Sequence, residues 1–402
     1  MSQPDTLPPS PTHWCTHPAR TILILAFAPA IGLGMGRFAY SLVLPDMRDT
    51  LSWSYATAGG MNTINAIGYL IGAFVASPLA ARAGLLKALW IGAMIAILSL
   101  AACAISGHII PFGIARLFSG IGAAIALVSG GALGASIAQS QPARSSLLIG
   151  LFYIGPALGI TISGSTAPFL LHAFGPGSWW IVWAGLTVIA LVMAVPLFLT
   201  RAEVPAPVQE STEEMASLRP IVLYLAGYFL YGAGYIAYMT FMIAYIRDAG
   251  GDAYAQSAFW CLIGLGGMVS PWTWRPLMAR GRSGLVMALT IGLTGVGAAL
   301  ALVASSAWMY AVSAFVFGNA FLAVVIALTA FTRFNYPPAQ WSKVIGGMTI
   351  VFSVGQIVGP VVTGAITDMT GSLTSALIVS AAALLLGAVV SAFQRPLKAS
   401  SV

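Results

Sequence analysis

Two arginines lie inside apolar segments of this chain, where a charged side chain is costly. Arg37 is in the stretch GMGRFAY (34–40), and Arg116 is in the fourth apolar segment. A charge at the centre of a bilayer costs about 2.5–3.5 kcal/mol on insertion scales, so such residues usually face a bundle interior or a wet cavity. Each guanidinium offers a planar fork of donors that matches a carboxylate or a phosphate. The pair therefore predicts a central cationic site for an anion; the alternative is that each arginine binds backbone carbonyls and fixes helix packing.

A row of tyrosines shares one face of a later segment. Its steps of 4, 3, 4, 3 and 7 residues match helical spacing, and its members are Tyr224, Tyr228, Tyr231, Tyr235, Tyr238 and Tyr245. Hydroxyl groups without partners are unfavourable in hydrocarbon, so this face should contact the central cavity or another helix. We predict that Tyr231, Tyr235 and Tyr238 contact substrate, together with Tyr40; ordinary helix packing is the alternative.

Other polar residues inside apolar segments are weaker candidates for substrate binding. They are Asn62, Asn65, Tyr69, Asn319 and Gln356, of which Asn62 and Asn319 are included in the predicted site. Each is also explained by a hydrogen bond between helices.

The remaining chemistry-bearing residues predict neither a metal site nor a cofactor. The histidines and cysteines form no cluster with metal-ligand spacing, and no phosphate-binding loop of the ATPase type is present. An enzyme inside the membrane would need an acid, base, nucleophile or metal set there. A sensor or assembly partner would usually carry a sizeable soluble domain, which the sequence lacks.

The elements that hold these residues are twelve apolar segments, each long enough to span a bilayer as a helix. Hydrophobic residues make up 59% of the chain and charged residues 7%, and the mean hydropathy is +0.92, whereas soluble domains are about 25% charged. The predicted spans are 21–45, 54–81, 86–106, 109–138, 144–171, 178–199, 218–246, 254–279, 284–304, 308–332, 342–367 and 373–393.

The positions of Lys and Arg predict the orientation of these spans. The net charge is +7, but the basic residues lie in short loops between apolar segments, which argues against nucleic-acid binding. With both termini in the cytoplasm, thirteen of the seventeen Lys and Arg residues are cytoplasmic and two are outside, which is the positive-inside bias expected of a correct topology. The polar segment 200–217 contains four glutamates and two prolines, and it reads as a linker between two halves.

The two halves also repeat. A shift of 198 residues aligns PLAAR (78–82) with PLMAR (276–280), which ends two spans at equivalent points. Parallel six-helix halves are a known transporter plan. We therefore predict an N-terminal tail (1–20), an N-terminal bundle (21–199), a linker (200–217), a C-terminal bundle (218–394) and a C-terminal tail (395–402), both tails being cytoplasmic.

The plan and three local patterns resemble the major facilitator superfamily (MFS) over about 21–394. The segment SPLAARAGLLK (77–87) is similar to that family's loop G-x-L-a-D-R-x-G-r-r; it keeps Arg82 and Gly84, but Ser77 and Ala81 replace the Gly and the Asp that helps to latch the halves. Arg116 begins a similarity to R-x-x-x-G-x-G-A-A, where the family links the arginine to proton coupling. GPALG (155–159) resembles the proton-antiporter signature, with Ile160 where a second Gly is usual.

The stretch GMGRFAY, followed by LPDM (44–47), is more narrowly similar to the bacterial YbfB/YjiJ-like branch. The resemblance implies an all-α protein of the bacterial inner membrane, with twelve transmembrane helices in two pseudo-repeats. It also implies a monomer and alternating access about a central site for a small organic solute. It favours proton-coupled efflux. Arginine does not release a proton at working pH, so proton symport or exchange that takes up a small organic anion is the alternative.

Conformational roles are predicted for small and basic residues near the ends and crossings of spans. Glycines four residues apart let helices approach closely. The predicted gating residues are Arg82, Gly84, Gly155, Pro156, Gly159, Arg280, Gly355 and Gly359.

Overall fold

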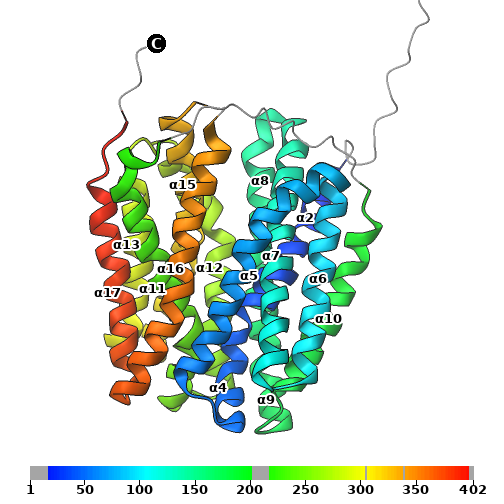
Figure 1. The fold of residues 1–402 in the computed structure, drawn as a ribbon, viewed down its shortest axis with the longest axis vertical. Coiled ribbons are helices and arrows are strands. Elements are labelled where there is room, and N and C mark those ends of the chain that lie inside the picture. The colour runs from blue at the N-terminus through cyan, green and yellow to red at the C-terminus, as the bar shows by residue number, and fades with distance from the viewer. Residues whose placement is uncertain (1–16, 202–216, 304–305, 338–339, 398–402) are drawn as a thin grey trace, which may run out of the picture.

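The computed structural model describes residues 17–201, 217–303, 306–337 and 340–397. The described chain is helical, and its helices run roughly parallel in two side-by-side bundles, with the last described residues, which follow α17, at the upper end of the view in Figure 1. We call that end, where the first span begins and the last span ends, the terminal end, and the opposite end the distal end. Most of the predicted linker 200–217 lies outside the described residues, and so does most of each predicted tail.

The first bundle contains six spans. Their helices are α2 (Pro18–Leu25), α3 (Phe27–Pro29), η1 (Ala30–Phe38), α4 (Tyr40–Leu51), α5 (Tyr55–Ala83), α6 (Leu85–Ile105), α7 (Ile109–Gln139), η2 (Pro142–Arg144), α8 (Ser145–Tyr153), α9 (Gly155–Phe174) and α10 (Trp179–Leu199). The first four pieces form one span, which extends six residues beyond its predicted end at 45. The span therefore includes Asp46, Arg48 and Asp49, which the sequence placed outside it.

The second bundle also contains six spans. Their helices are η3 (Arg219–Ile221), α11 (Val222–Asp248), α12 (Ala253–Met278), α13 (Leu285–Val303), α14 (Ala307–Phe321), α15 (Ala323–Asn335), α16 (Trp341–Thr370) and α17 (Leu373–Ala392). Within the described chain, eleven spans are long and apolar enough to cross a membrane. The predicted span 254–279 corresponds to α12, which has the length but is less apolar.

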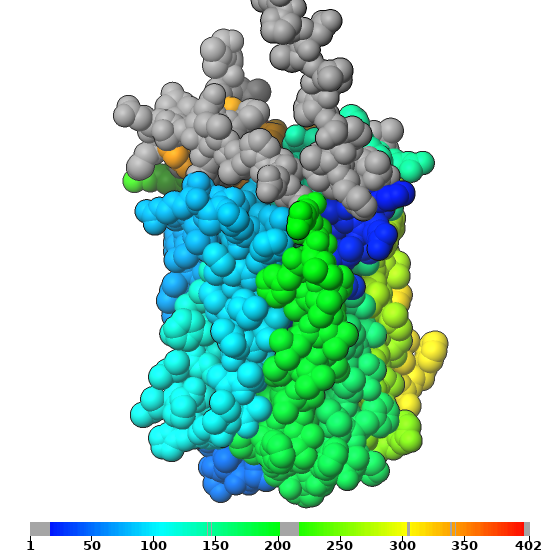
Figure 2. Space-filling model, turned by 90° about the vertical axis from the view of Figure 1, so that its right-hand side faces the viewer, coloured from blue at the N-terminus to red at the C-terminus, as the bar shows by residue number. Residues whose placement is uncertain are grey.

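Apolar side chains on the outer faces of the helices are exposed. Figure 2 shows one such face, on which α10 runs almost the full height of the bundle beside α6. Leu98 on α6 and Val188, Val192 and Val195 on α10 are each about 60% exposed. Such a wide apolar surface is expected to face lipid, since soluble proteins rarely expose one.

Glycine contacts inside each bundle follow the sequence repeat. A Cβ on Gly155 or Gly159 would collide with the backbone of the first span at Ala26 or Ala30. A Cβ on Gly355 or Gly359 would collide in the same way with α11, at Phe229 or Ala233. The fifth span thus packs on the first as the eleventh packs on the seventh, which is consistent with two equivalent halves.

The halves meet along two symmetric pairs of helices. α9 packs against α12, and α5 packs against α16. The close approaches there belong to glycines that the sequence analysis did not single out: Gly59 faces the carbonyl of Pro360, Gly364 faces that of Tyr55, and Gly264 faces Thr161. The predicted pairs 155/159 and 355/359 instead pack helices within a half.

Candidate functional site

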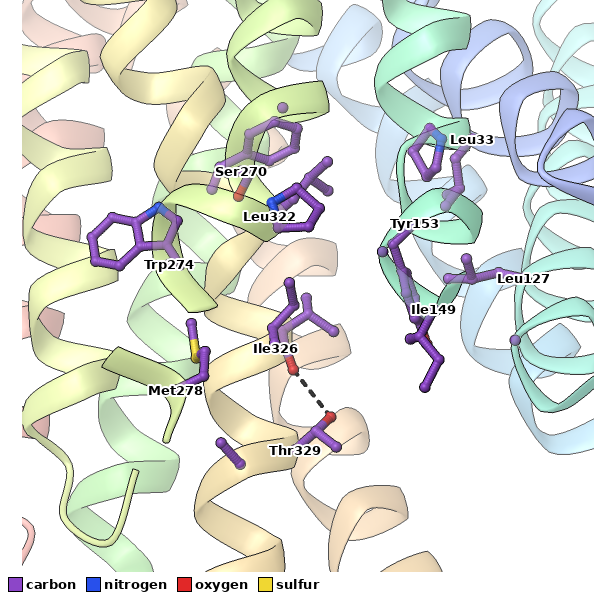
Figure 3. A pocket seen from close by; sticks show the side chains of 18 of the residues that line it. Leu33, Leu127, Ile149, Tyr153, Ser270, Trp274, Met278, Leu322, Ile326 and Thr329 are labelled. Carbon is purple, nitrogen blue, oxygen red and sulfur yellow. Dashed lines mark hydrogen bonds between the residues drawn. The ribbon is translucent and has the colours of Figure 1, made fainter. Parts of the chain in front are cut away.

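A cavity of about 820 Å³ lies between the two halves. Figure 3 shows Leu33, Leu127, Ile149 and Tyr153 of the first half on one side. It shows a second wall from the other half, with the labelled residues Ser270, Trp274, Met278, Leu322, Ile326 and Thr329. The lining includes terminal-end residues of α12, α15 and α16 and mid-span residues of η1 and α11. The cavity therefore runs from the terminal end to the middle of the bundle.

Arg37 lies in this cavity and is 2% exposed. Its Nε and Nη2 atoms are buried and have no hydrogen-bond partner in the described chain. The guanidinium carbon lies 4.9 Å from the centroid of the Tyr69 ring, a cation–π distance. A buried guanidinium with unused donors is unfavourable unless a ligand or water satisfies it.

The backbone around Arg37 forms a π-helix, η1. Such wide turns are rare and occur often at functional sites. Gly34 lies so close to Gly159 of α9 that neither position has room for a Cβ, and a Cβ on Gly32 would lie 2.7 Å from the Cα of Ala123 on α7. The glycines thus let η1 pack against two neighbouring helices while Arg37 contributes to the cavity.

Arg116 is fully buried but does not line the cavity. Its Nη1 donates a hydrogen bond to the carbonyl of Gly36, and its Nη2 donates to the carbonyl of Arg37 at 3.3 Å and to Oδ1 of Asn62 at 3.2 Å. Its guanidinium carbon is 4.7 Å from the Tyr40 ring centroid. Both arginines were expected to face one cavity; in this conformation Arg116 instead binds the carbonyls of η1 through its guanidinium.

The electrostatic character of the cavity is cationic. The described lining contains three arginines, Arg37 at mid-span and Arg275 and Arg333 at the mouth, and no Asp, Glu, His or Lys. Arg333 lies 5.6 Å from the centroid of the Trp341 ring, which also lines the mouth. Like charges around a low-dielectric cleft concentrate ions of the opposite sign, so this cavity favours an anion.

Aromatic rings form the inner wall beside Arg37. Tyr228 stacks on Phe352 at 4.6 Å between centroids, and Tyr231 stacks on Tyr235 at 4.8 Å. The planes of Tyr235 and Phe352 differ by only 7°. These four near-parallel rings line the cavity and offer an apolar surface to the carbon skeleton of a ligand.

The distal end of the molecule is closed between the halves. The hydroxyl of Ser41 donates to the carbonyl of Thr240 at 3.0 Å, and that of Thr63 donates to the carbonyl of Ile357 at 2.7 Å. Asn62 donates from Nδ2 to the hydroxyl of Thr240. All three contacts join the first half to the second, so the described conformation is open at one end only.

The family of this chain follows from a comparison of its sequence. The family model described as "Uncharacterised MFS-type transporter YbfB" matches residues 29–392, which is most of the chain. The chain belongs to this family of MFS transporters. It is therefore a multi-pass membrane transporter and not an enzyme.

Relatives of this MFS transporter agree with that assignment. The hexuronate transporter of Bacillus subtilis (strain 168) is 25% identical over 403 residues, which cover 89% of this chain and 90% of the relative. Among solved structures, the nucleoside transporter NupG (D323A mutant) has a TM-score of 0.71 at 14% identity and covers 92% of this chain and 98% of its own. A bacterial homologue of the human lysosomal transporter Spinster, solved inward-facing and unoccupied, has a TM-score of 0.67 at 16% identity and covers 97% and 100%. The two structures confirm the MFS fold.

The predicted site residues of the transporter fall into two groups, those that line the cavity and those that do not. Arg37, Tyr231 and Tyr235 line the cavity together. The other predicted residues, Tyr40, Arg116, Tyr238, Asn62 and Asn319, do not line it in this conformation.

Each residue of the second group has partners within the protein. The Tyr40 hydroxyl donates to the carbonyl of Ala58 at 2.8 Å, and the Tyr238 hydroxyl lies 3.0 Å from that of Ser313. Asn319 accepts from the Trp274 indole at 3.0 Å and donates to Thr273 at 3.1 Å. These hydrogen bonds fix helix packing, as the alternative interpretation of each residue had allowed, although Nε of Arg116 is buried without a partner in the described chain.

The predicted gating residues are distributed along the transporter. Arg82 and Arg280 are exposed at the terminal end, and Gly84, with φ of 86°, ends α5 and precedes α6. Pro156 lines the cavity. Residues other than glycine adopt such a positive φ only with strain, so the position of Gly84 favours glycine.

Several lining residues were missed by the sequence analysis. Phe38, Phe321 and Phe352 carry no polar signal, and aromatic residues are common in every apolar segment. Ser270 and Trp274 lie on the less apolar α12, and that lower hydropathy was the available signal.

Proposed function

We propose that this transporter carries a small organic anion and that Arg37 binds the substrate's carboxylate. The observation that carries the proposal is the Arg37 guanidinium, which is buried in a cavity with two nitrogen atoms unpartnered in the described chain. A carboxylate would accept both donors in the bidentate geometry that arginine favours. Arg275 and Arg333 at the mouth would draw the anion inward.

The name of the Bacillus subtilis relative supports a carboxylate, since a hexuronate is a sugar acid. The mouth of the cavity lies at the end that carries most of the predicted cytoplasmic Lys and Arg residues. With the termini in the cytoplasm, as the distribution of basic residues predicts, the structure is inward-facing. Substrate would then exchange between the two sides as the halves rock about the site.

The sequence resemblance favours proton-coupled efflux. Proton antiport by the protein needs a group that binds and releases a proton near neutral pH, and the described cavity lining contains no Asp, Glu, His or Lys. The geometry therefore favours uptake of the anion, with a proton carried on the substrate or by exchange for another anion. Asp46 lies near the closed distal end and does not line the cavity. It accepts hydrogen bonds from the backbone N–H groups of Gly177 and Trp179 at 2.8 and 2.9 Å, so it is engaged in capping α10.

The test is transport of labelled glucuronate and of simpler carboxylates into vesicles that contain purified protein. We expect saturable transport by the wild type and at least a tenfold loss of kcat/KM in Arg37→Gln. Arg20→Gln is the matched control, because Arg20 is exposed and does not line the cavity. Equal transport by Arg37→Gln and wild type would contradict the proposal.

Efflux of uncharged hydrophobic compounds is the second candidate. It is favoured by the size of the cavity and by its stacked aromatic wall. In that case neutral compounds should bind wild type and Arg37→Gln equally, and carboxylates should not compete with them.

A further inference from the structure

Gln356 presents an unused hydrogen-bond acceptor at the cavity. It lies on α16, lines the cavity and is 1% exposed. Its Nε2 donates to the hydroxyl oxygen of Tyr235, while its Oε1 is buried and accepts no hydrogen bond in the described chain. Buried amide oxygens normally have a donor, so a ligand that carries a donor would remove this deficit.

This acceptor and Arg37 belong to different halves of the transporter. Phe38, the residue after Arg37, contacts Phe321 edge-on with 6.2 Å between ring centroids. Phe321 in turn lies 6.2 Å from the ring of Tyr235, the partner of Gln356. A short chain of aromatic contacts therefore connects the residue that follows Arg37 in the first half to the hydrogen-bond partner of Gln356 in the second.

We propose that Gln356 is a specificity-determining residue that selects hydroxylated organic acids. The substrate's carboxylate binds Arg37, and one of its hydroxyl groups donates to Oε1 of Gln356. This inference rests on the proposed anion transport and adds the second contact. A substrate bound in this way joins the two halves, whereas an acid without hydroxyl groups satisfies Arg37 and leaves Oε1 without a donor.

The stacked rings complete the site. Tyr231, Tyr235 and Phe352 line the same region of the cavity, where their apolar surface would pack against the C–H groups of the acid. A site built around an unpaired polar atom discriminates against analogues that lack its partner, because the atom then stays unpaired.

The experiment measures dissociation constants by intrinsic tryptophan fluorescence of the purified full-length protein. The probes are gluconate with its hydroxyl-free counterpart hexanoate, and glycerate with propionate. We expect the hydroxylated acid of each pair to bind wild type about tenfold more tightly. In Gln356→Leu this ratio should fall to about one, while the affinity for hexanoate and propionate should change less than threefold.

Two further variants separate specificity from folding. Tyr235→Phe removes the hydrogen bond to Gln356 but keeps Oε1, so the tenfold ratio should persist. Thr349→Val also alters a cavity-lining residue of α16. The Thr349 hydroxyl donates to the carbonyl of Ile345 in the same helix at 2.7 Å, so this variant should also keep the tenfold ratio. If Gln356→Leu is poorly folded, Tyr235→Phe still tests the proposal. Loss of the tenfold ratio in Tyr235→Phe would assign the preference to the tyrosine and overturn the proposal.

The outcomes distinguish this inference from the proposed function. If both acids of each pair bind wild type equally and Arg37→Gln loses both, anion binding is supported and the role of Gln356 is rejected. If Gln356→Leu weakens both acids of a pair by the same factor, its role is structural. If no acid binds wild type, the proposed function fails and this inference fails with it.

Discussion

The carboxylate of Asp368 accepts a hydrogen bond from the backbone N–H of Tyr55 at 2.9 Å, and a second from that of Ala56 at 2.8 Å. Asp368 lies in the last turn of α16 and Tyr55 begins α5, so one side chain of the second half caps a helix of the first. An anion at a helix N-terminus interacts favourably with the helix dipole. This contact closes the distal end of the molecule, opposite the open cavity.

Loss of the Asp368 cap should favour opening of the distal end. We expect Asp368→Asn to shift the equilibrium toward the distally open conformation by about fivefold to tenfold, since helix caps contribute about 1 kcal/mol. Distances between spin labels placed on the distal ends of α5 and α16 would measure the shift. Asp46→Asn is the matched control: Asp46 caps α10 within one half, so its loss should lower stability and leave the equilibrium unchanged.

Arg116 and Arg37 should respond oppositely to neutralisation. Arg116→Gln removes donors from the carbonyls of Gly36 and Arg37, and we expect it to destabilise the protein by about 2–4 kcal/mol. Arg37→Gln removes a buried charge that has unpartnered donors, so the free protein should keep or gain stability. Thermal unfolding of both variants in detergent checks this order, and a larger loss of stability in Arg37→Gln would contradict it.

Gly59 and Gly364 should control the distal interface between the halves. A Cβ at Gly59 would collide with the carbonyl of Pro360, and one at Gly364 with that of Tyr55. We expect Gly59→Val and Gly364→Val to lower occupancy of the distally closed state, increasing the accessibility of an engineered cysteine near Thr240 to an impermeant thiol reagent at least fivefold. Gly159→Val should instead lower folding yield, because its collision is with Ala30 inside one half; unchanged accessibility in both interface variants would exclude this role for the glycines.

The mouth arginines should act on substrate capture more than on turnover. Arg275→Gln and Arg333→Gln should each raise KM for a carboxylate less than tenfold at low salt and leave kcat nearly unchanged, because their charges attract the anion without holding it at mid-span. The effect should diminish above about 0.15 M salt, where screening is strong. Initial rates in vesicles at two ionic strengths test this, and a fall in kcat with constant KM would place these residues in the transport step instead.

The sequence by itself determined the spans, the family and the presence of a central charge. A transmembrane segment is a local property, because about 20 contiguous apolar residues suffice to cross the bilayer. A charge such as Arg37 is recognisable inside such a segment without knowledge of any neighbour. The lining of the cavity by Arg37, Tyr231 and Tyr235 together was foreseeable from these patterns, because a polar group in the membrane must face protein or water.

Only the tertiary structure separated Arg37 from Arg116, which look alike in the sequence. Arg116 finds its acceptors 79 and 80 residues away, on η1. The π-helix also rotates the residues that follow it relative to an ordinary helix, and the Tyr40 hydroxyl binds the carbonyl of Ala58. Side-chain direction depends on helix rotation and on distant partners, and neither is encoded in the local apolar pattern from which the spans were predicted. The same reason explains why Gln356, one polar residue among several, was distinguished only by its contact with Tyr235 and its unpartnered oxygen.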